Sequence, residues 1–171
     1  MILALSSSSA IASAALFSPE GQLVASGERE APRAASGALI QLCEPWLQEH
    51  ALSGIVADVG PGSFTGVKVA VMLAKTWGYL YQIPVGGIAA FDLISRDGVR
   101  VIPSRKGEFF VHDGHELTIS PHALASEPPI AAHLAATWDR IQWSTALELE
   151  PNYIFPPSIS QPKRAPGLLT P

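Results

Sequence analysis

The sequence predicts an α/β fold in which a meander of three strands is followed by strands that alternate with helices. Short apolar runs separated by turn residues fill the first thirty positions, which indicates consecutive strands. After residue 33 the apolar residues change to a helical spacing, and a buried strand, a glycine-rich turn and a second helix follow. A doubly wound dinucleotide-binding fold would instead begin with strand, helix and strand, so the sequence disfavours it.

The meander is predicted from apolar runs at residues 1–5, 10–17 and 22–27, with a turn at Pro19-Glu20-Gly21. A helix is predicted at 35–50, where apolar residues recur at three- and four-residue spacing. Pro45 should kink this helix or end it. Residues 55–59 are apolar enough for a strand that is buried on both faces, and a helix is predicted to follow at 67–82.

A second unit is predicted from about residue 99. After a short strand at 84–85 that Gly86-Gly87 should break and a short helix at 88–94, residues 100–103 form a strand. Residues 108–112 and 115–119 form a hairpin around a two-residue Asp113-Gly114 turn. A helix at 128–137 and a strand at 138–143 complete this unit. The predicted boundaries are 1–98, 99–150 and a proline-rich tail at 151–171.

Size and charge limit the possible functions. A chain of 171 residues typically buries about 70% of its unfolded surface, so it can form a core without cross-links. Charged residues make up 15% of the chain against about 25% in an average soluble domain, which predicts a surface partly covered by a partner. The net charge of −4 argues against unaided binding to nucleic acid, because that binding depends on clustered Lys and Arg.

The predicted location is the cytoplasm. The single cysteine, Cys43, excludes an intramolecular disulfide and a four-thiolate zinc site, which fits a reducing compartment. The apolar start of the chain lacks the positive region of a secretory signal, since the first basic residue is Arg29. The serine run at 6–9 also divides it into pieces far shorter than the ~18 residues of a membrane span.

The segment from Gly60 to Gly66 joins the predicted buried strand to its helix, and two interpretations of it are open. Its backbone N–H groups and the positive helix end could hold a phosphate. Alternatively, Gly62 and Gly66 allow a tight reversal and close helix packing, while Ser63 or Thr65 caps the helix. The glycine spacing fails the Walker pattern and matches the dinucleotide fingerprint only weakly, so the structural interpretation is favoured.

No catalytic residue, metal or cofactor is predicted. Ser63 lacks the glycine of a nucleophile elbow, because Pro61 stands at that position, and no base can be assigned to it. His112 and His115 have a spacing sometimes seen in metal sites, and Asp113 and Glu116 could complete such a site. They flank a predicted hairpin turn, where two exposed imidazoles need no metal.

The helix at 67–82 has a polar stripe limited mainly to Lys68, Lys75 and Gln82, with apolar residues around it. A helix exposed on one side should have a broader polar face, so this one is expected to be covered on two sides. The second cover could be the helix at 35–50 or a partner protein. The low charge of the chain favours a partner.

The loop resembles the signature of the TsaB (YeaZ) family, accessory subunits of the bacterial machinery that makes threonylcarbamoyladenosine in tRNA. The matching residues are Gly60-Pro61-Gly62-Ser63-Phe64-Thr65-Gly66-Val67-Lys68. Further similarity lies in residues 2–6 and 83–92, in Arg105-Lys106-Gly107-Glu108-Phe109-Phe110, and in Pro151-Asn152-Tyr153. The resemblance covers residues 1–110 well and the remainder poorly.

This resemblance implies an actin/Hsp70-like (ASKHA) lobe of ribonuclease-H-like topology with a smaller, shortened second lobe. It implies a non-catalytic partner of the TsaD subunit, which carries the metal and transfers the threonylcarbamoyl group, with a TsaE-type ATPase joining the complex. Family members form homodimers when alone, and tRNA would be contacted only indirectly. The resemblance places the interface on the two helices of the first lobe. The predicted contacts are Leu39, Trp46, Val67, Lys68, Val71, Met72 and Lys75.

The alternative function is a nucleotide-binding ATPase or a peptidase-like enzyme of the same fold. Family members commonly carry Asp where this chain has Ser6, and again where it has Pro103. Carboxylates at such strand ends support metal and nucleotide chemistry in the wider fold. Their replacement makes an enzyme the less favoured hypothesis.

Overall fold

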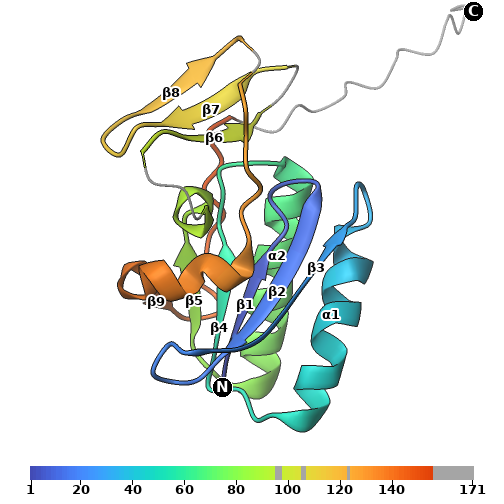
Figure 1. The fold of residues 1–171 in the computed structure, drawn as a ribbon. Helices are drawn as coiled ribbons and strands as arrows, with labels where there is room; N and C mark the ends of the chain where they lie inside the picture. Colours follow the sequence, from blue (N-terminus) through green and yellow to red (C-terminus); the bar gives the residue numbers. More distant parts are fainter. Residues whose placement is uncertain (95–97, 105–106, 123, 156–171) are drawn as a thin grey trace, which may run out of the picture.

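A six-stranded mixed sheet with helices on both faces forms the larger part of the chain, and a three-stranded sheet lies beyond one end of it (Figure 1). The structure is a computed structural model that describes residues 1–94, 98–104, 107–122 and 124–155. The proline-rich segment at 156–171, predicted from the sequence to be extended, lies outside the described residues. Among the helices of the described ranges, none combines the length and the apolar composition that a membrane crossing requires.

The large sheet is built as the sequence predicts, from an antiparallel meander that continues through two helical crossovers. Strand β1 pairs antiparallel with β2 and parallel with β4, and β4 pairs parallel with β5, so the order is β3-β2-β1-β4-β5-β9. Its elements are β1 (Ile2–Ser6), β2 (Ile11–Phe17), β3 (Leu23–Glu30), α1 (Ala35–Glu49), β4 (Gly54–Asp58), α2 (Phe64–Tyr81), β5 (Val85–Ile88) and β9 (Gln142–Ser144).

Both faces of the central strands are buried, by different elements. In β1, Leu3 and Leu5 pack against α1 and α2, whereas Ile2 and Ala4 point to the opposite face. That opposite face is covered by two 3₁₀ helices, η1 (Ala90–Leu93) and η2 (Ala131–Arg140). Strands buried on both faces are therefore apolar throughout, as residues 55–57 also show.

Two elements continue through residues at which the sequence allows them to end. Helix α1 continues through Pro45 to Glu49. Proline removes one backbone hydrogen bond, and Pro45 is exposed, so the freed carbonyl can be hydrated while the inner face of the helix stays packed. Strand β5 likewise runs through Gly86 and Gly87. A Cβ at Gly86 would lie 2.6 Å from Cγ2 of Ile141, so glycine here permits close packing of the chain that follows η2.

The small sheet consists of β6 (Arg100–Pro103), β7 (Phe109–His112) and β8 (Leu117–Ser120). The predicted hairpin between β7 and β8 is confirmed, but its turn is longer than predicted. His112 pairs with Leu117, so residues 113–116 form the loop. The Asp113 carboxylate accepts hydrogen bonds from the backbone N–H groups of His115 and Glu116 at 2.8 and 2.9 Å, which stabilises the longer turn.

Residues 131–149 return to the large sheet, although the sequence groups them with the second unit. Strand β9 (Gln142–Ser144) pairs antiparallel with β5, and Leu149 packs in the core under α2. The helix and strand predicted at 128–143 form η2 and β9, with Trp138 in the helix rather than in the strand. The small sheet therefore involves only residues 100–120.

The reactivity of the Cys43 thiol tests how tightly α1 packs. Its side chain is fully buried, and this burial raises the pKa of the thiol to about 12, because the thiolate would lose its hydration. We expect the folded chain to resist a disulfide-exchange reagent at mildly alkaline pH and to react as urea unfolds it. The measurement is the absorbance of the thiolate that the reagent releases at each urea concentration, compared with the unfolding curve from tryptophan fluorescence. Rapid reaction without urea would contradict the burial.

Candidate functional site

Two loops meet at the carboxyl ends of the central parallel strands, where ligand sites of α/β sheets are usually found. The serine run at 6–9 follows β1, and the glycine loop at 59–63 follows β4. The backbone N–H of Ser63 donates to the carbonyl of Ser8 at 2.7 Å, which joins the two loops directly. This junction contains the motif that the sequence singles out.

Asp58, at the end of β4, is the buried centre of the junction. Its Oδ2 accepts hydrogen bonds from Ser6 Oγ at 2.7 Å and from Ser8 Oγ at 2.5 Å, and its Oδ1 accepts one from the backbone N–H of Gly60 at 2.8 Å. Burial raises the pKa of the Asp58 carboxyl, and these donors oppose the rise. Both oxygens are thus used within the chain.

The hydrogen bonds of Asp58 show that a carboxylate lies beside Ser6. The sequence indicates a carboxylate missing from the end of β1, but the structure places a carboxylate beside that position, on β4. Sequence reasoning missed Asp58 because it lies at the end of an apolar run and its hydroxyl partners come about fifty residues earlier. The detectable signal was an acidic residue immediately before a glycine loop.

The helix cap predicted at Ser63 is confirmed. Ser63 is the N-cap of α2, and its Oγ accepts a hydrogen bond from the backbone N–H of Gly66 at 3.3 Å. Thr65 lies inside the helix. A side chain at Gly66 would overlap the carbonyl oxygen of Ser7, whose hydroxyl donates to the Gly66 carbonyl at 2.8 Å. The glycine thus allows α2 to begin directly against the serine loop.

The rest of the loop is also packed. Gly60 has a φ of +94°, a conformation that favours glycine, and the Gly60–Pro61 peptide bond is cis. The ring of Phe64 contacts that of Tyr153, with centroids 4.6 Å apart. An open cavity of about 410 Å³ remains beside the loop, at the start of α1 and α2, lined by serine hydroxyls and Arg33.

The sequence also raises a metal site at His112 and His115 and a nucleophile at Ser63. Within the described residues, no group of three or more His, Cys, Asp or Glu side chains is placed to hold a metal ion. His112 accepts a hydrogen bond at Nδ1 from the backbone N–H of Gly114 at 3.1 Å, as part of the exposed β7–β8 turn. Ser63 serves as a helix cap.

The predicted interface residues divide into buried and exposed groups. Val67 and Val71 are each 1% exposed and belong to the core between α2 and the sheet, as does Leu39 on α1. These three cannot contact a partner while the chain keeps this packing, which corrects the prediction for them. Lys68 and Met72 are exposed.

The two remaining predicted residues, Lys75 and Trp46, are engaged inside the chain. Lys75 Nζ donates to the carbonyls of Leu147 and Leu149 at 3.2 and 2.9 Å and holds that segment against α2. Trp46 is half-buried against the core.

A groove of about 350 Å³ lies between α1 and α2 on the side away from the sheet. Ile40 and Leu47 of α1 face Leu73, Trp77 and Tyr81 of α2 across it, with Glu44 and Gln48 at the α1 side. Residues 73, 77 and 81 recur at four-residue spacing and form one stripe of α2. The sequence predicts this helix pair as an interface, but Val67 and Val71, two of its predicted contacts, lie on the buried side of α2 and not in this groove.

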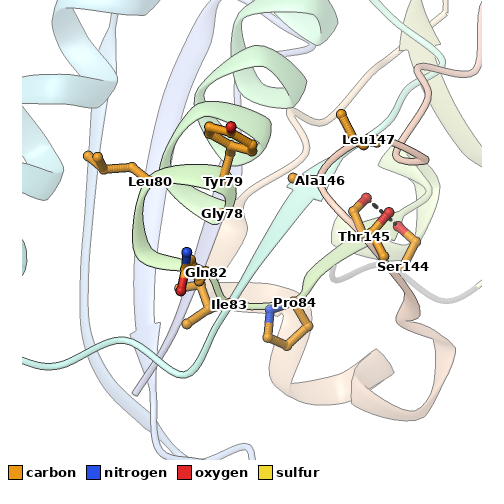
Figure 2. Close-up of a pocket in the computed structure, with 10 residues that line it drawn as sticks. All are labelled: Gly78, Tyr79, Leu80, Gln82, Ile83, Pro84, Ser144, Thr145, Ala146 and Leu147. Carbon is orange, nitrogen blue, oxygen red and sulfur yellow. Dashed lines mark hydrogen bonds between the residues drawn. The ribbon is translucent and has the colours of Figure 1, made fainter.

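A larger open groove of about 680 Å³ lies where α2 ends and the chain passes from β9 to residue 147 (Figure 2). Its lining is mostly apolar and includes Tyr79, Leu80, Ile83, Pro84 and Leu147. Among the residues that line it, none is ionisable except the Tyr79 phenol. The groove therefore offers a contact surface rather than a catalytic centre.

Known proteins resemble this chain over part of its sequence and over most of its fold. The family model for TsaD, tRNA N6-adenosine threonylcarbamoyltransferase, matches residues 29–98. The TsaB protein of Bacillus subtilis, named for tRNA threonylcarbamoyladenosine biosynthesis, is 40% identical over 47 residues, which are 28% of this chain and 20% of that protein. An uncharacterized protein of Mycobacterium leprae is 37% identical over 62 residues, 36% of this chain and 16% of that protein. The alignments thus span a fifth or less of these relatives.

The fold extends much further than the sequence similarity. YeaZ from Pseudomonas aeruginosa superimposes with a TM-score of 0.71 at 19% identity, over 90% of this chain and 99% of that chain. A crystal structure described as similar to peptidase YeaZ, also from Pseudomonas aeruginosa, gives a TM-score of 0.75 at 20% identity over the same shares. The ASKHA-like α/β fold expected from the glycine-loop motif is therefore confirmed. The loop, the local identity to TsaB and this fold together support an assignment to the TsaB (YeaZ) family.

Proposed function

We propose that the chain acts in tRNA threonylcarbamoyladenosine biosynthesis as a non-catalytic accessory subunit that binds a TsaD-like threonylcarbamoyltransferase. The printed name of the Bacillus subtilis relative and the match to the TsaD family model support the process. In this proposal a TsaE-type ATPase joins the same assembly, and the chain touches tRNA only through its partners. The net charge of −4 agrees with an indirect role.

The observation that carries the proposal is the apolar outer surface of α1 and α2. Ile40 and Tyr81, which line the groove between these helices, are each 45% exposed. Single exposed apolar side chains are ordinary, but a continuous apolar groove between two helices is typical of a protein contact. A helix of the partner that enters this groove would bury it.

The accessory role is supported by how the junction uses its polar groups. Ser63 caps α2, and both oxygens of Asp58 are occupied by donors from the same chain. The Ser6 hydroxyl donates a hydrogen bond to Asp58 and also lies 3.2 Å from the Pro129 carbonyl. These groups are engaged in holding the two loops together, and the exposed helix surface remains for association.

Ile40→Asp is expected to abolish co-elution with the TsaD-like protein of the same genome, because it places a charge in the apolar groove between α1 and α2. Loss of a hot-spot residue costs about 2 kcal/mol or more, or roughly a thirtyfold weaker complex. The measurement is the mass of the co-expressed species by size-exclusion chromatography with light scattering. The variant alone should stay folded, since Ile40 is already 45% exposed.

Ile119→Asp is the matched control, because Ile119 is 43% exposed on β8, in the small sheet. It should leave the complex intact. Equal loss in both variants, or intact complex in both, would contradict the interface. Val71→Asp is unsuitable as a probe, since that charge would enter the core. If ATP with magnesium raises the melting temperature of the isolated chain, the ATPase alternative gains support instead.

A further inference from the structure

A polar cavity of about 460 Å³ lies on the face of the large sheet opposite α1 and α2, where η1, η2 and the start of β6 come together. Most of its polar lining comes from five side chains: Asp92, Arg100, His133, Thr137 and Arg140. They belong to three different elements of the chain. Nothing in the function proposed above uses them.

The two arginines share a single oxygen of one carboxylate. Arg140 Nη1 lies 2.5 Å from Asp92 Oδ1, and Arg100 Nη1 lies 3.4 Å from the same atom while donating to the Phe91 carbonyl at 2.9 Å. Asp92 is the single acidic residue among the described residues that line the cavity. Among the described residues that line the cavity, two positive charges therefore face one negative charge.

The cluster is held in place by backbone contacts. His133 Nδ1 lies 2.9 Å from the Leu93 carbonyl, so this nitrogen is the donor and Nε2 is left for another group. Thr137 Oγ1 donates to the Asp92 carbonyl at 2.9 Å. The side chain of Arg100 is only 16% exposed, and its Nε is buried without a hydrogen-bond partner. These contacts fix the groups before any ligand arrives.

We propose that this cavity binds the phosphate group of a small molecule. Guanidinium groups recognise phosphate through paired, charge-assisted hydrogen bonds, and the described hydrogen bonds of both arginines use only Nη1. Arg100 comes from β6 and Arg140 from η2, so a tetrahedral anion can present different oxygens to each. The volume lies within the usual range of small-molecule sites, about 300–1,000 Å³, and leaves room for an organic group on the phosphate.

The experiment is isothermal titration calorimetry of the full chain with inorganic phosphate, glycerol phosphate and acetate, each at the same ionic strength in chloride. We expect saturable one-to-one binding of the two phosphates and none of acetate. Tighter binding of glycerol phosphate than of inorganic phosphate would identify an organic phosphate as the ligand, and the reverse would identify the free anion. No saturable binding of either phosphate overturns the proposal.

Two substitutions should change phosphate affinity in opposite directions. Arg140→Ala should weaken binding at least tenfold, and its side chain is 54% exposed, so the fold should tolerate the loss. Asp92→Asn should tighten binding severalfold, because it removes the charge that repels the anion and competes for both arginines. Arg140→Lys, which keeps the charge and loses the planar fork, should lie between wild type and Arg140→Ala.

Arg29→Ala is the control, since Arg29 is an exposed cation on β3, outside the cavity lining. It should leave phosphate affinity unchanged. Equal losses for Arg29→Ala and Arg140→Ala would show general charge attraction and overturn the site. Because the cavity and the α1–α2 groove lie on opposite faces of the sheet, failure here would leave the partner-binding proposal standing.

Discussion

Replacing Gly66 by alanine is expected to lower the free energy of unfolding by about 3 kcal/mol, and replacing it by valine to prevent folding. The new Cβ would overlap the carbonyl oxygen of Ser7. That oxygen cannot withdraw easily, because the Ser7 hydroxyl donates to the Gly66 carbonyl at 2.8 Å and Ser63 holds the neighbouring Ser8 carbonyl at 2.7 Å. Urea unfolding followed by tryptophan fluorescence measures the loss.

Gly37→Ala provides the matched control, because Gly37 also lies in the first turn of a helix, α1. A Cβ there would meet no heavy atom within 4 Å. This substitution should stabilise the chain by about 0.5–1 kcal/mol, since alanine has the higher helix propensity. If both alanine variants shifted the urea midpoint in the same direction, the close approach of α2 to the serine loop would not be what Gly66 provides.

The order of elements could be predicted from the sequence because it depends on local periodicity. The meander, both long helices and the strand that leads into the glycine loop follow from apolar spacing within windows of a few turns. The cap at Ser63 follows from residue type and position. Features that depend on close packing could not be predicted in this way. At Gly86, for example, the absence of a side chain lets Ile141 pack closely, and the strand does not end there.

The sites were less predictable because their parts are distant along the chain. Ser6 and Asp58 are 52 residues apart, and Asp92 and Arg140 are 48 residues apart, so no local pattern connects them. The choice of contact residues on α2 was difficult for a different reason. A helix that is apolar around most of its circumference does not reveal which stripe faces its own sheet, and Val71 and Met72, adjacent in sequence, lie in the core and on the surface respectively.

Asp58→Ala is expected to lower the free energy of unfolding by about 3 kcal/mol, because it removes the acceptor of three buried donors. Those donors are the Ser8 hydroxyl, the backbone N–H of Gly60 and the Ser6 hydroxyl, which keeps the Pro129 carbonyl at 3.2 Å. Asp58→Asn keeps the volume and one acceptor oxygen, so near neutral pH it should cost much less. Urea unfolding of both variants beside wild type separates the loss of hydrogen bonds from the loss of charge.

The pH dependence of Asp58→Asn tests how the carboxyl is held. Burial raises the pKa of Asp58 in the folded chain above its ordinary value of 3.8, so between these two pKa values the folded chain binds more protons than the unfolded chain. The stabilising contribution of Asp58 is therefore greatest below pH 3.8 and is lost as the pH rises through the folded pKa. Asparagine does not titrate, so the free energy of unfolding of Asp58→Asn, relative to wild type, should increase across that interval. A decrease would mean that the three donors outweigh burial and that Asp58 persists as a carboxylate, the form that a strand-end acid needs for metal or nucleotide chemistry.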